Sequence, residues 1–434
     1  MNSSRREFLK RSASTAVGAI ILPQIIPSSA LGLNGMTAPS DRIVMGSIGL
    51  GSQGTSNMKN FLKFKQVQWV AVCDVDKKHN QSAKAIVDKT YENTDCRAYG
   101  DFREFLEKEK LDAVCLSLPD HWHSIISVSC ANKKLDIYGE KPLARSIREG
   151  QAISAAAHKN NIIWQTGSWQ RSVENFHRGA QLVRNGRIGK VTHVEVGLPD
   201  GNRSIGTPAV MPVPAELDWE FWLGPALKVP YRGVSHWNWR WIQDYSGGQL
   251  TDWAGHHIDI AHWGLGFDET GPISVEGEGV FPREGIYNVA VEYDFTCAYK
   301  DGTTMRVANA SRQKYGMGTV WYGDKGWLRV NRGDVIEASD PNILKEKISE
   351  NEIQLYKSTD HFLNFLECIK SRKPTITPVD TALRSISVGL LGEIAMLTGQ
   401  KIQWDPEKQE IVDNAMASRL LSRPYRQPWT IPTI

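Results

Sequence analysis

The chain has little cysteine, and what it has is scattered. Six cysteines occur among 434 residues, and no two of them form a Cys-x-x-Cys pair. This spacing disfavours the common zinc and redox motifs and a disulfide framework. Cys73 and Cys115 fall within apolar, strand-like runs, so we expect both to be buried thiols.

The chain also lacks an excess of charge of either sign. Its 51 Lys and Arg residues against 48 Asp and Glu residues give a formal net charge of +3. Residues 1–30 carry four of the basic side chains and one acidic one, so the rest of the chain is formally neutral. Nucleic-acid-binding proteins carry a basic face for the phosphates. We therefore expect no nucleic-acid partner.

A long apolar run is missing as well. A membrane-spanning helix needs about 20 apolar residues, and the apolar stretch at 16–26 is shorter. It follows Arg5-Arg6 and Phe8-Leu9-Lys10 and precedes the small residues Ser28-Ser29-Ala30. This order predicts a twin-arginine signal peptide over residues 1–30, hence folded export to the periplasm and no membrane span after processing. A membrane anchor or a disordered basic tail is the alternative.

The first motif after an expected linker at 31–41 is a glycine-rich loop. An apolar run at 43–48 leads into Gly49-Leu50-Gly51-Ser52-Gln53-Gly54, which fits GxGxxG, and a second apolar run ends at Asp74. Gly49 permits the tight turn, Gly51 lets the backbone approach a pyrophosphate, and Gly54 lets the helix pack on the strand. The Asp74 carboxylate can accept ribose hydroxyls and repels a 2′-phosphate. The motif therefore predicts NAD rather than NADP, with a glycine-rich turn that binds nothing as the alternative.

Strands and helices then alternate. We expect helices at 79–89, 101–109, 121–133 and 146–160, and strands at 112–118, 135–140 and 162–167. Such alternation predicts a Rossmann domain with a doubly wound parallel sheet over residues 42–165. Ligands of such sheets bind beyond the carboxyl ends of the strands. The stretches LPDHWH (118–123), GEKP (139–142) and TGSWQR (166–171) lie at such ends.

The second half has a different pattern. Alternating strands are expected at 190–198, 273–281, 289–308 and 322–330, with a hairpin turn at Asp301-Gly302, and amphipathic helices at 358–374 and 381–399. We therefore expect an α+β domain over residues 166–434, with a large, mostly antiparallel open sheet and helices on one face. The chain would thus have two domains, as its length also indicates.

Three side chains are candidates for chemistry. Lys141 directly follows an expected strand and precedes Pro142, where a cis bond is an option, so it can reach cofactor and substrate together. Asp252 and His256 are four residues apart and share a face of a helix, with Asp259 one turn further. A carboxylate beside an imidazole suits proton transfer at neutral pH. The alternatives are a surface lysine in a turn and histidines satisfied within a helix.

A zinc site is a further alternative for this stretch. His256, His257 and His262 are close in sequence, but no cysteine or glutamate supplies the remaining ligands. We therefore expect no metal.

Tryptophan is concentrated in one region. Seven of the fifteen tryptophans lie between residues 219 and 263, and HWNWRWIQD (236–244) alternates aromatic with polar residues. Tryptophan faces stack on sugar rings while neighbouring polar groups bond the hydroxyls, so a carbohydrate ligand is expected. We expect Arg240 and Trp241 to face it. Burial in the core or in a subunit interface is the alternative for most of these rings.

Taken together, these motifs resemble the Gfo/Idh/MocA (glucose–fructose oxidoreductase / inositol dehydrogenase) family. The resemblance rests on GLGSQG, AVCDVD, LPDHWHSIISVSCANKKLDIYGEKPLA, the Gln-Arg of WQR and GGQLTDWAGHHIDIA, and it extends from about residue 41 to the C-terminus. It implies that Lys141 is the catalytic lysine and that Asp252 and His256 are its partners. His257 doubles the histidine, so an exchange of roles with His256 stays open.

The resemblance also implies a set of binding residues. Those expected at NAD are Gly49, Gly51, Ser52, Gln53, Gly54, Asp74, Leu118, Asp120, His123, Glu140, Lys141, Trp169 and Arg171. Those expected at the substrate are Lys141, Arg171, Arg240, Trp241, Asp252, His256 and His257. Many members have Thr-Pro-Asn where this chain has Leu118-Pro119-Asp120, so Asp120 departs from the family pattern.

The function implied by the resemblance is oxidation of a secondary alcohol on a sugar, glycoside or polyol, with a 3-keto glycoside as one product option. A homo-oligomer, dimer or tetramer, is expected through the open face of the second sheet. The alternatives are an NAD-dependent glycosidase or lyase that works by oxidation, elimination and addition, and a sugar-binding protein without turnover. NAD-dependent N-acetylgalactosaminidases of the first kind typically lack the lysine of GEKP. Export without a nucleotide pool further predicts that NAD is loaded before export and then held tightly.

Overall fold

The computed structural model describes residues 41–202, 204–233 and 238–434. The predicted signal peptide, the predicted linker up to residue 40, and His236 and Trp237 of the tryptophan-rich stretch lie outside the described residues. The chain divides into the units Met1–Arg42 and Ile43–Ile434, and the second unit contains both sheets and the site described below.

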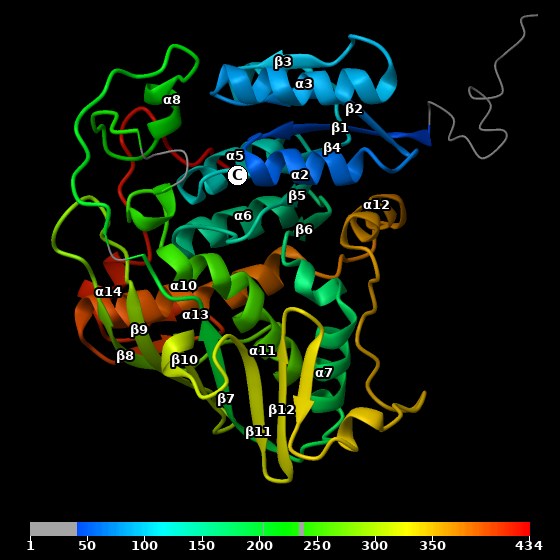
Figure 1. The fold of residues 1–434 in the computed structure, drawn as a ribbon, viewed down its shortest axis with the longest axis vertical. Coiled ribbons are helices and arrows are strands. Elements are labelled where there is room, and N and C mark those ends of the chain that lie inside the picture. The colour runs from blue at the N-terminus through cyan, green and yellow to red at the C-terminus, as the bar shows by residue number, and fades with distance from the viewer. Residues whose placement is uncertain (1–40, 203, 234–237) are drawn as a thin grey trace, which may run out of the picture. The chain divides into compact units, whose positions relative to one another are not determined.

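The first sheet is a six-stranded parallel sheet in the order β3-β2-β1-β4-β5-β6, as Figure 1 shows. Its strands are β1 (Ile43–Ile48), β2 (Val67–Cys73), β3 (Arg97–Tyr99), β4 (Ala113–Leu116), β5 (Asp136–Gly139) and β6 (Trp164–Thr166). The strand order reverses between β1 and β4, and a ligand crevice opens at such a switch point. The predicted doubly wound Rossmann sheet is confirmed.

Helices connect these strands where the sequence predicts them. They are α2 (Ser52–Phe61), α3 (Lys77–Tyr91), α4 (Phe102–Lys108), α5 (His123–Asn132) and α6 (Ile147–Lys159). Side chains cap three of them, because Asp76, Asp101 and Ser146 accept hydrogen bonds from N–H groups of the first turn. The helix expected from residue 121 begins as the 3₁₀ turn η2 (Asp120–Trp122). The sequence did not predict strand β3. This strand is only three residues long and mostly exposed, so it has no apolar pattern.

Within the described residues, the second sheet has nine strands in the order β13-β12-β11-β7-β10-β9-β8-β14-β15. They are β7 (Val191–Leu198), β8 (Ser274–Val280), β9 (Glu292–Ala298), β10 (Thr304–Asn309), β11 (Gly318–Gly323), β12 (Gly326–Asn331), β13 (Val335–Ala338), β14 (Ile402–Asp405) and β15 (Glu410–Ile411). β7 and β10 pair in parallel and the other described neighbours are antiparallel, which confirms the expected sheet. The predicted hairpin turn joins β9 to β10, with Gly302 at a φ of +90°.

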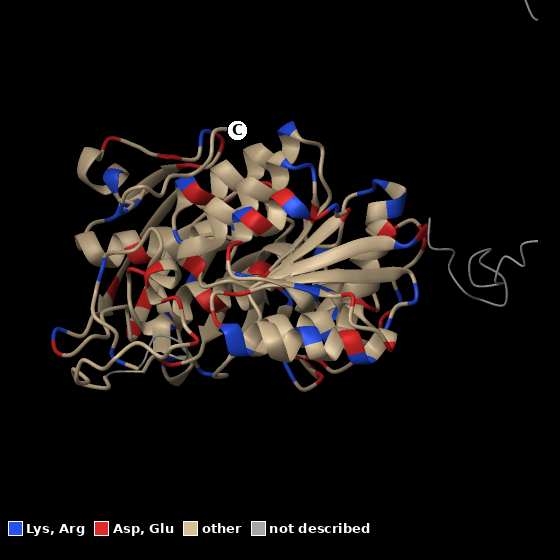
Figure 2. Cartoon of the chain, turned by 90° about the horizontal axis from the view of Figure 1, so that it is seen from above, with Lys and Arg blue, Asp and Glu red and all other residues tan. Residues whose placement is uncertain are grey.

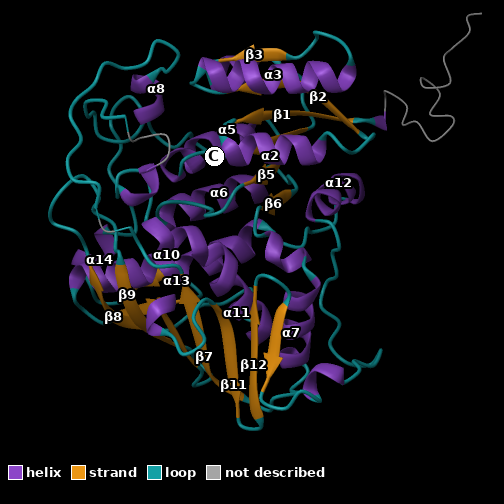
Figure 3. Ribbon diagram, in the orientation of Figure 1, coloured by secondary structure: helices purple, strands orange, loops and turns teal. Residues whose placement is uncertain are grey.

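Helices cover one face of this sheet (Figure 3). They include α7 (Glu174–Arg184), α11 (Asp259–Leu265) and α13 (Val379–Thr398), while α12 (His361–Ser371) packs on the first domain. The α13 helix contacts β8 on one side and α6 on the other, so it connects the two sheets through one core. It is long and apolar enough to cross a membrane, but 83% of its apolar window is buried in the protein, as expected for a core helix.

The opposite face of the second sheet carries polar side chains. Arg306 pairs with Asp294, and Tyr322 donates to Glu195, all on neighbouring strands. Charges of both signs are interspersed over the ribbon in Figure 2. The use of this face in an oligomer stays a prediction.

The six cysteines are all free and buried. Cys73 ends β2 and Cys115 lies within β4, which confirms the two predicted strand thiols.

Short elements make up most of the site. They are η3 (Trp169–Ser172), α8 (Trp219–Leu223), η4 (Trp239–Trp241), α10 (Gly248–Trp253) and η5 (Ala254–Ile258), the last a π-helical turn. The remaining short helices are η6 (Ala310–Arg312), η7 (Ile343–Lys345) and α14 (Ala415–Arg419).

Candidate active site

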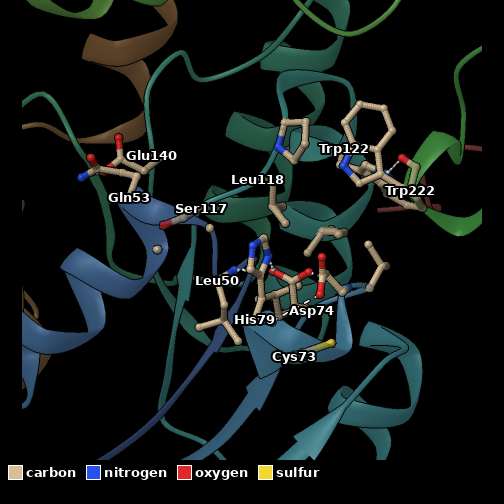
Figure 4. A pocket seen from close by; sticks show the side chains of 18 of the residues that line it. Leu50, Gln53, Cys73, Asp74, His79, Ser117, Leu118, Trp122, Glu140 and Trp222 are labelled. Carbon is tan, nitrogen blue, oxygen red and sulfur yellow. Dashed lines mark hydrogen bonds and ion pairs between the residues drawn. The ribbon is translucent and has the colours of Figure 1, made fainter. Parts of the chain in front are cut away.

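A cavity of about 450 Å³ lies at the carboxyl ends of β1, β2, β4 and β5. Figure 4 shows Gln53 and Glu140 on one side of it, Trp122 and Trp222 on the other, and Asp74 with His79 between them. The size is within the range of small-molecule sites. The predicted residues that line it are Gly49, Gly51, Ser52, Gln53, Gly54, Asp74, Leu118, Glu140, Lys141 and Arg240.

The three glycines of the loop have the shapes that the motif predicts. Gly49 has a φ of +88°, and a Cβ there would lie 2.2 Å from the carbonyl oxygen of Ser117. A Cβ at Gly54 would lie 2.1 Å from the carbonyl oxygen of Gly49, whereas one at Gly51 would meet nothing within 4 Å. Helix α2 begins at Ser52 without a side-chain cap. An open backbone surface beside an uncapped helix N-terminus fits a pyrophosphate.

Asp74 is held at the rim by backbone donors. Its Oδ2 accepts a hydrogen bond from the N–H of Leu50 at 2.7 Å, and its Oδ1 accepts one from the N–H of Asp76 at 2.8 Å. The Nδ1 of His79 lies 3.3 Å from Oδ2, and this contact with Asp74 raises the pKa of His79. Oδ1, which accepts the N–H of Asp76, keeps a second lone pair. Asp74 can therefore accept a ribose hydroxyl at Oδ1 without moving.

Glu140 is fixed by amide and N–H donors. Asn57 Nδ2 donates to its Oε1 at 2.9 Å, Gln53 Nε2 donates to the same oxygen at 3.2 Å, and the N–H of Lys141 donates to Oε2 at 3.3 Å. A Cβ at Gly167 would come within 2.8 Å of the carboxylate. Glu140 thus connects the loop after β1 to the loop after β5 and fixes the position of the Lys141 backbone.

A second cavity of about 720 Å³ adjoins the first and shares Asp74, Val75, Gly100 and Phe221 with it. Residues 213 and 215–221 line it, and they belong to the segment 213–226, here called the cover segment. The N–H of Lys77 donates to the carbonyl of Glu216 at 2.9 Å, and the N–H of Asp218 donates to the carbonyl of Val75. Backbone bonds therefore fasten the cover segment to the end of β2.

The C-terminal tail fastens the same segment from outside. Arg426 Nε donates to the carbonyls of Gly224 and Ala226 at 3.0 and 2.9 Å. The ring of Trp429 meets Trp122 edge-on at 4.7 Å between centroids and Phe221 at 5.3 Å. Two distant parts of the chain thus close the same side of the cavity.

Lys141 lies in a buried cluster of charges at the other end of the cavity. Its Nζ donates to Asp252 Oδ1 at 2.8 Å, and Arg240 Nε donates to the same oxygen at 2.9 Å. Burial alone raises the pKa of Asp252, but the charges of Lys141 and Arg240 outweigh burial and lower it. Asp252 is therefore a carboxylate that holds two cations. The Lys141–Pro142 bond is cis.

His256 lies beside this cluster in the π-helical turn η5. A Cβ at the preceding Gly255 would lie 3.0 Å from Lys141 Cβ, so the turn packs directly on the lysine. His256 is 3% exposed, and burial together with the charges of Lys141 and Arg332 lowers its pKa well below the ordinary value. Its Nδ1 has no hydrogen-bond partner in the described part of the chain. The imidazole is therefore neutral at pH 7 and able to accept a proton.

His257 faces away from Lys141. Its Nδ1 lies 3.4 Å from Gln170 Nε2, its ring stacks on Trp253 at 5.5 Å, and its carbonyl accepts the hydroxyl of Thr319 on the second sheet. Burial lowers its pKa to about 3. The geometry thus separates the two histidines, with His256 at the lysine and His257 packed between Trp253 and the second sheet.

The regular helix expected over Asp252, His256 and Asp259 is interrupted. The turn η5 inserts a π-helical segment between α10 and α11, and such turns are frequent at functional sites. Asp259 therefore does not share the face of Asp252. It is buried, and accepts hydrogen bonds from Arg171 and from the Ser385 hydroxyl.

The position of Arg171 differs from the one expected. It is 2% exposed, and its guanidinium forms bidentate bonds with Asp259 at 2.7 and 2.9 Å and with Asp268 at 2.7 and 3.0 Å. It also lies over the ring of Trp263. With its donors committed to two carboxylates, Arg171 holds α11 in place and does not face the cavity.

Eight of the residues expected at ligands do not line this cavity in the described structure: Asp120, His123, Trp169, Arg171, Trp241, Asp252, His256 and His257. Asp120 accepts a 2.6 Å hydrogen bond from the Ser246 hydroxyl, and His123 Nε2 bonds the carbonyl of Leu118. Both therefore support the wall from behind. Trp241 packs on Tyr287, and since successive side chains of the 3₁₀ turn η4 point in different directions, Trp239 lines the cavity instead.

Trp169 lies beside His256, with 6.4 Å between ring centroids, and is 38% exposed. Two further features of the site were not predicted from the sequence. One is the cover segment, and the other is Arg332, which lies over the ring of Trp169. Neither carries a motif. The aromatic density of residues 219–222 was the one available signal for the first.

Two family models match the chain. The NAD-binding Rossmann fold of the oxidoreductase family matches residues 43–168, and its C-terminal alpha/beta domain matches residues 201–431. The chain belongs to the Gfo/Idh/MocA oxidoreductase family. It is accordingly an NAD-binding oxidoreductase of the Gfo/Idh/MocA type.

Two curated relatives differ in activity. The chain is 26% identical over 278 residues to myo-inositol 2-dehydrogenase of Thermotoga maritima, a match covering 63% of this chain and 70% of that protein. It is 26% identical over 220 residues to alpha-N-acetylgalactosaminidase of Shewanella oneidensis, a match covering 45% of each. Less than half of that hydrolase is therefore matched.

Two solved structures share the fold of this chain. The WlbA dehydrogenase of Bordetella pertussis, in complex with NADH and UDP-GlcNAcA, has a TM-score of 0.63 at 17% identity and covers 84% of this chain and 99% of its own. The scyllo-inositol dehydrogenase of Lactobacillus casei, with NAD(H) and scyllo-inositol, has a TM-score of 0.59 at 19% identity and covers 83% and 99%.

Proposed function

We propose that this protein is an NAD-dependent dehydrogenase that oxidises a secondary alcohol of a sugar, glycoside or polyol. The observation that carries the proposal is the buried contact of Lys141 with Asp252, beside a neutral His256, because Lys141 itself lines the cavity that also contains the glycine loop. The inositol dehydrogenase among the relatives supports a polyhydroxylated substrate.

The cavity fits a nicotinamide dinucleotide by its own geometry. The open backbone at Gly51 and the N-terminus of α2 would hold the pyrophosphate, and Asp74 would accept the ribose hydroxyls. When bound, the nicotinamide supplies an acceptor for hydride. Asp74, together with Asp101 and Glu104 in the adjoining cavity, supports NAD over NADP, because carboxylates repel a 2′-phosphate.

The side chains around Lys141 provide the proton chemistry. The Lys141 ammonium, held by Asp252, donates to the oxygen of the reacting hydroxyl and orients it. Neutral His256 accepts the hydroxyl proton, since its lowered pKa keeps it unprotonated at working pH. Asp252 stays ionised throughout because two cations bond it.

Folded export fits a cofactor that is never exchanged. We propose that residues 1–30 direct periplasmic export and that NAD is loaded beforehand. With an association rate of about 10⁶ M⁻¹s⁻¹, retention for a day needs a Kd on the order of 10 pM. The cover segment, bonded to β2 and to the C-terminal tail, supports such retention, because it closes one side of the cavity.

A second candidate is a glycosidase that oxidises, eliminates the aglycone, adds water and reduces again. The match to the Shewanella oneidensis alpha-N-acetylgalactosaminidase favours it. Both candidates begin with the same oxidation. They differ in whether reduced nucleotide accumulates.

One experiment tests both. The purified protein is dialysed and denatured, and the released nucleotide is identified by mass spectrometry and absorbance. Native protein is then incubated with a panel of polyols, sugars and nitrophenyl glycosides, with NADH and nitrophenol followed together. We expect NAD to be released, and NADH to form with at least one sugar or polyol. Nitrophenol release without net NADH supports the glycosidase. Absence of any nucleotide binding contradicts both.

A further inference from the structure

Arg332 brings a cation from the second sheet to the substrate end of the site. It directly follows β12, whose last residue is Asn331. Its Cζ lies 4.3 Å from the ring centroid of Trp253 and 4.8 Å from that of Trp169. Its Nε donates to Gln170 Oε1 at 3.0 Å. Two indole rings and one amide therefore hold the guanidinium in place. Because the side chain is already ordered, a ligand that binds it does so at low entropic cost.

The remaining donors of Arg332 have no acceptor. Among residues 41–202, 204–233 and 238–434, no side chain or carbonyl accepts a hydrogen bond from its Nη1 or Nη2. The side chain is half-buried, and its charge acts on Asp252, His256 and His257. These Nη groups are thus available beside the proposed proton acceptor.

Two guanidiniums that are more deeply buried than that of Arg332 have their own carboxylates. Arg171 bonds Asp259 and Asp268, and Arg145 bonds Glu393 through two parallel contacts of 2.7 and 2.9 Å. At the substrate end, by contrast, Lys141 and Arg240 share the single carboxylate of Asp252. The cation of Arg332 therefore has no anion of its own in the described structure.

We propose that Arg332 binds a carboxylate of the substrate, so that the preferred substrate is an acidic sugar such as a uronic acid or its glycoside. This inference rests on the proposed function of the site. A guanidinium whose Nε is already bonded keeps its two terminal groups as a planar fork, which matches a carboxylate. The exposed edge of Trp169 beside it leaves this end open to solvent.

Binding to matched sugar pairs tests the proposal without relying on turnover. The NAD-loaded protein is titrated by calorimetry and by tryptophan fluorescence at constant ionic strength. The probes are the methyl glycosides of glucose, galactose and mannose, each beside its uronate. We expect at least one uronate to bind about 10-fold or more tightly than its neutral partner, because hydrogen bonds to charged groups contribute about that much.

Variants assign the effect to the guanidinium. Arg332→Gln should weaken the preferred uronate about 10- to 100-fold and change its neutral partner less than about 3-fold. Arg332→Lys keeps the charge but loses the fork, and should still lose several-fold. The matched control is Arg329→Gln on the preceding strand β12. Its side chain bonds Glu337 and lies near Tyr315, and the substitution should change the affinity for neither ligand.

The outcomes separate this inference from the proposed function. If no uronate is preferred, or if neither Arg332 variant affects one, the carboxylate site is wrong even where neutral sugars yield NADH. If Arg332-dependent uronate binding is found but no sugar yields NADH, the carboxylate site stands and the dehydrogenase proposal fails. Should Arg332→Gln not fold, Arg332→Lys decides between these results.

Discussion

The two ends of the cavity are built in different ways. The cofactor end uses backbone and glycine mainly from the first part of the sheet, with Gly49, Gly51 and Asp74 close together in sequence. The substrate end uses charged side chains from segments far apart, with Lys141 after β5, Asp252 on α10 and Arg332 after β12. The cofactor is constant, so a backbone surface that recognises it needs little variation in sequence. Side chains that recognise a substrate can each be substituted, so substrate preference can change at every such position.

Their electrostatics differ as well. At the cofactor end, Asp74 and Glu140 are bonded mainly by backbone N–H and amide groups. At the substrate end, Asp252 is bonded by two cations in a buried setting. Removal of one charged partner from such a buried cluster leaves an uncompensated charge. Removal of a neutral donor leaves the net charge of the site unchanged. Substitutions at the substrate end should therefore have the larger effects.

Lys141→Ala gives the largest expected effect. It removes the proposed donor to the reacting hydroxyl, so the second-order rate constant for reduction of the bound NAD should fall about 10³-fold, within the range of acid–base and electrostatic contributions. The absorbance of the bound nucleotide during a single turnover with the active sugar measures it. Lys84→Ala, which removes a comparable 2.8 Å pair with Asp88 on α3, is the control and should leave the rate unchanged. NADH formation at the wild-type rate in Lys141→Ala contradicts the catalytic assignment.

The pH dependence of stability should have opposite signs at the two ends. His257 has a lowered pKa of about 3 in the fold, so the unfolded chain takes up its proton first as pH falls below about 6.5. Its neutral burial therefore costs stability at low pH, about 2 kcal/mol at pH 5 relative to pH 8. His79, whose pKa is raised by Asp74, stabilises below the ordinary histidine pKa and loses this as pH rises through its raised value.

Denaturant unfolding at pH 5, 6, 7 and 8 measures both histidines. His257→Gln should flatten the loss of unfolding free energy toward pH 5, and His79→Gln should steepen it. If His257→Gln has the same pH profile as wild type, the neutral burial of His257 is not the cause of the loss of unfolding free energy toward pH 5.

Gly51→Ala should have a smaller effect that is confined to the cofactor. A Cβ there meets no protein atom within 4 Å, so folding is expected to be unaffected. It projects onto the open backbone surface, and a ligand pressed against it should lose about 10-fold in affinity. Release of NAD into excess competing ADP-ribose measures this. Gly54→Ala is the contrast, because its Cβ meets the carbonyl of Gly49 and should lower the melting temperature. Equal NAD release from Gly51→Ala and wild type contradicts the pyrophosphate site.

Trp429→Ala should have the smallest effect. It removes the edge-on contacts with Trp122 and Phe221 but leaves the Arg426 bonds to the cover segment. NAD release should speed up a few-fold, since aromatic pairs contribute about 0.5–1.5 kcal/mol. Trp327→Ala on the second sheet is the control. An unchanged release rate in Trp429→Ala indicates that the tail does not help to retain the cofactor.

The sequence determined the parts of this protein that depend on local pattern. The GxGxxG loop, the alternating strands and helices and the hairpin at Asp301-Gly302 follow from backbone conformation, which neighbouring residues dictate. Lys141 was found because it directly follows a strand of a parallel sheet, and the ends of such strands meet at one edge. Asp252 was found through its spacing from His256.

Only the tertiary structure decided how charged side chains were shared out. Arg171 belongs to the turn η3 and Arg332 bonds Gln170 of the same turn, yet the first is bonded by two carboxylates and the second has none among the described residues. The π-helical turn likewise moved Asp259 away from Asp252 although their spacing fits a regular helix. Ion pairs form between segments that the sequence keeps far apart. Their geometry therefore exists only once both sheets have packed around α13, and no local pattern records it.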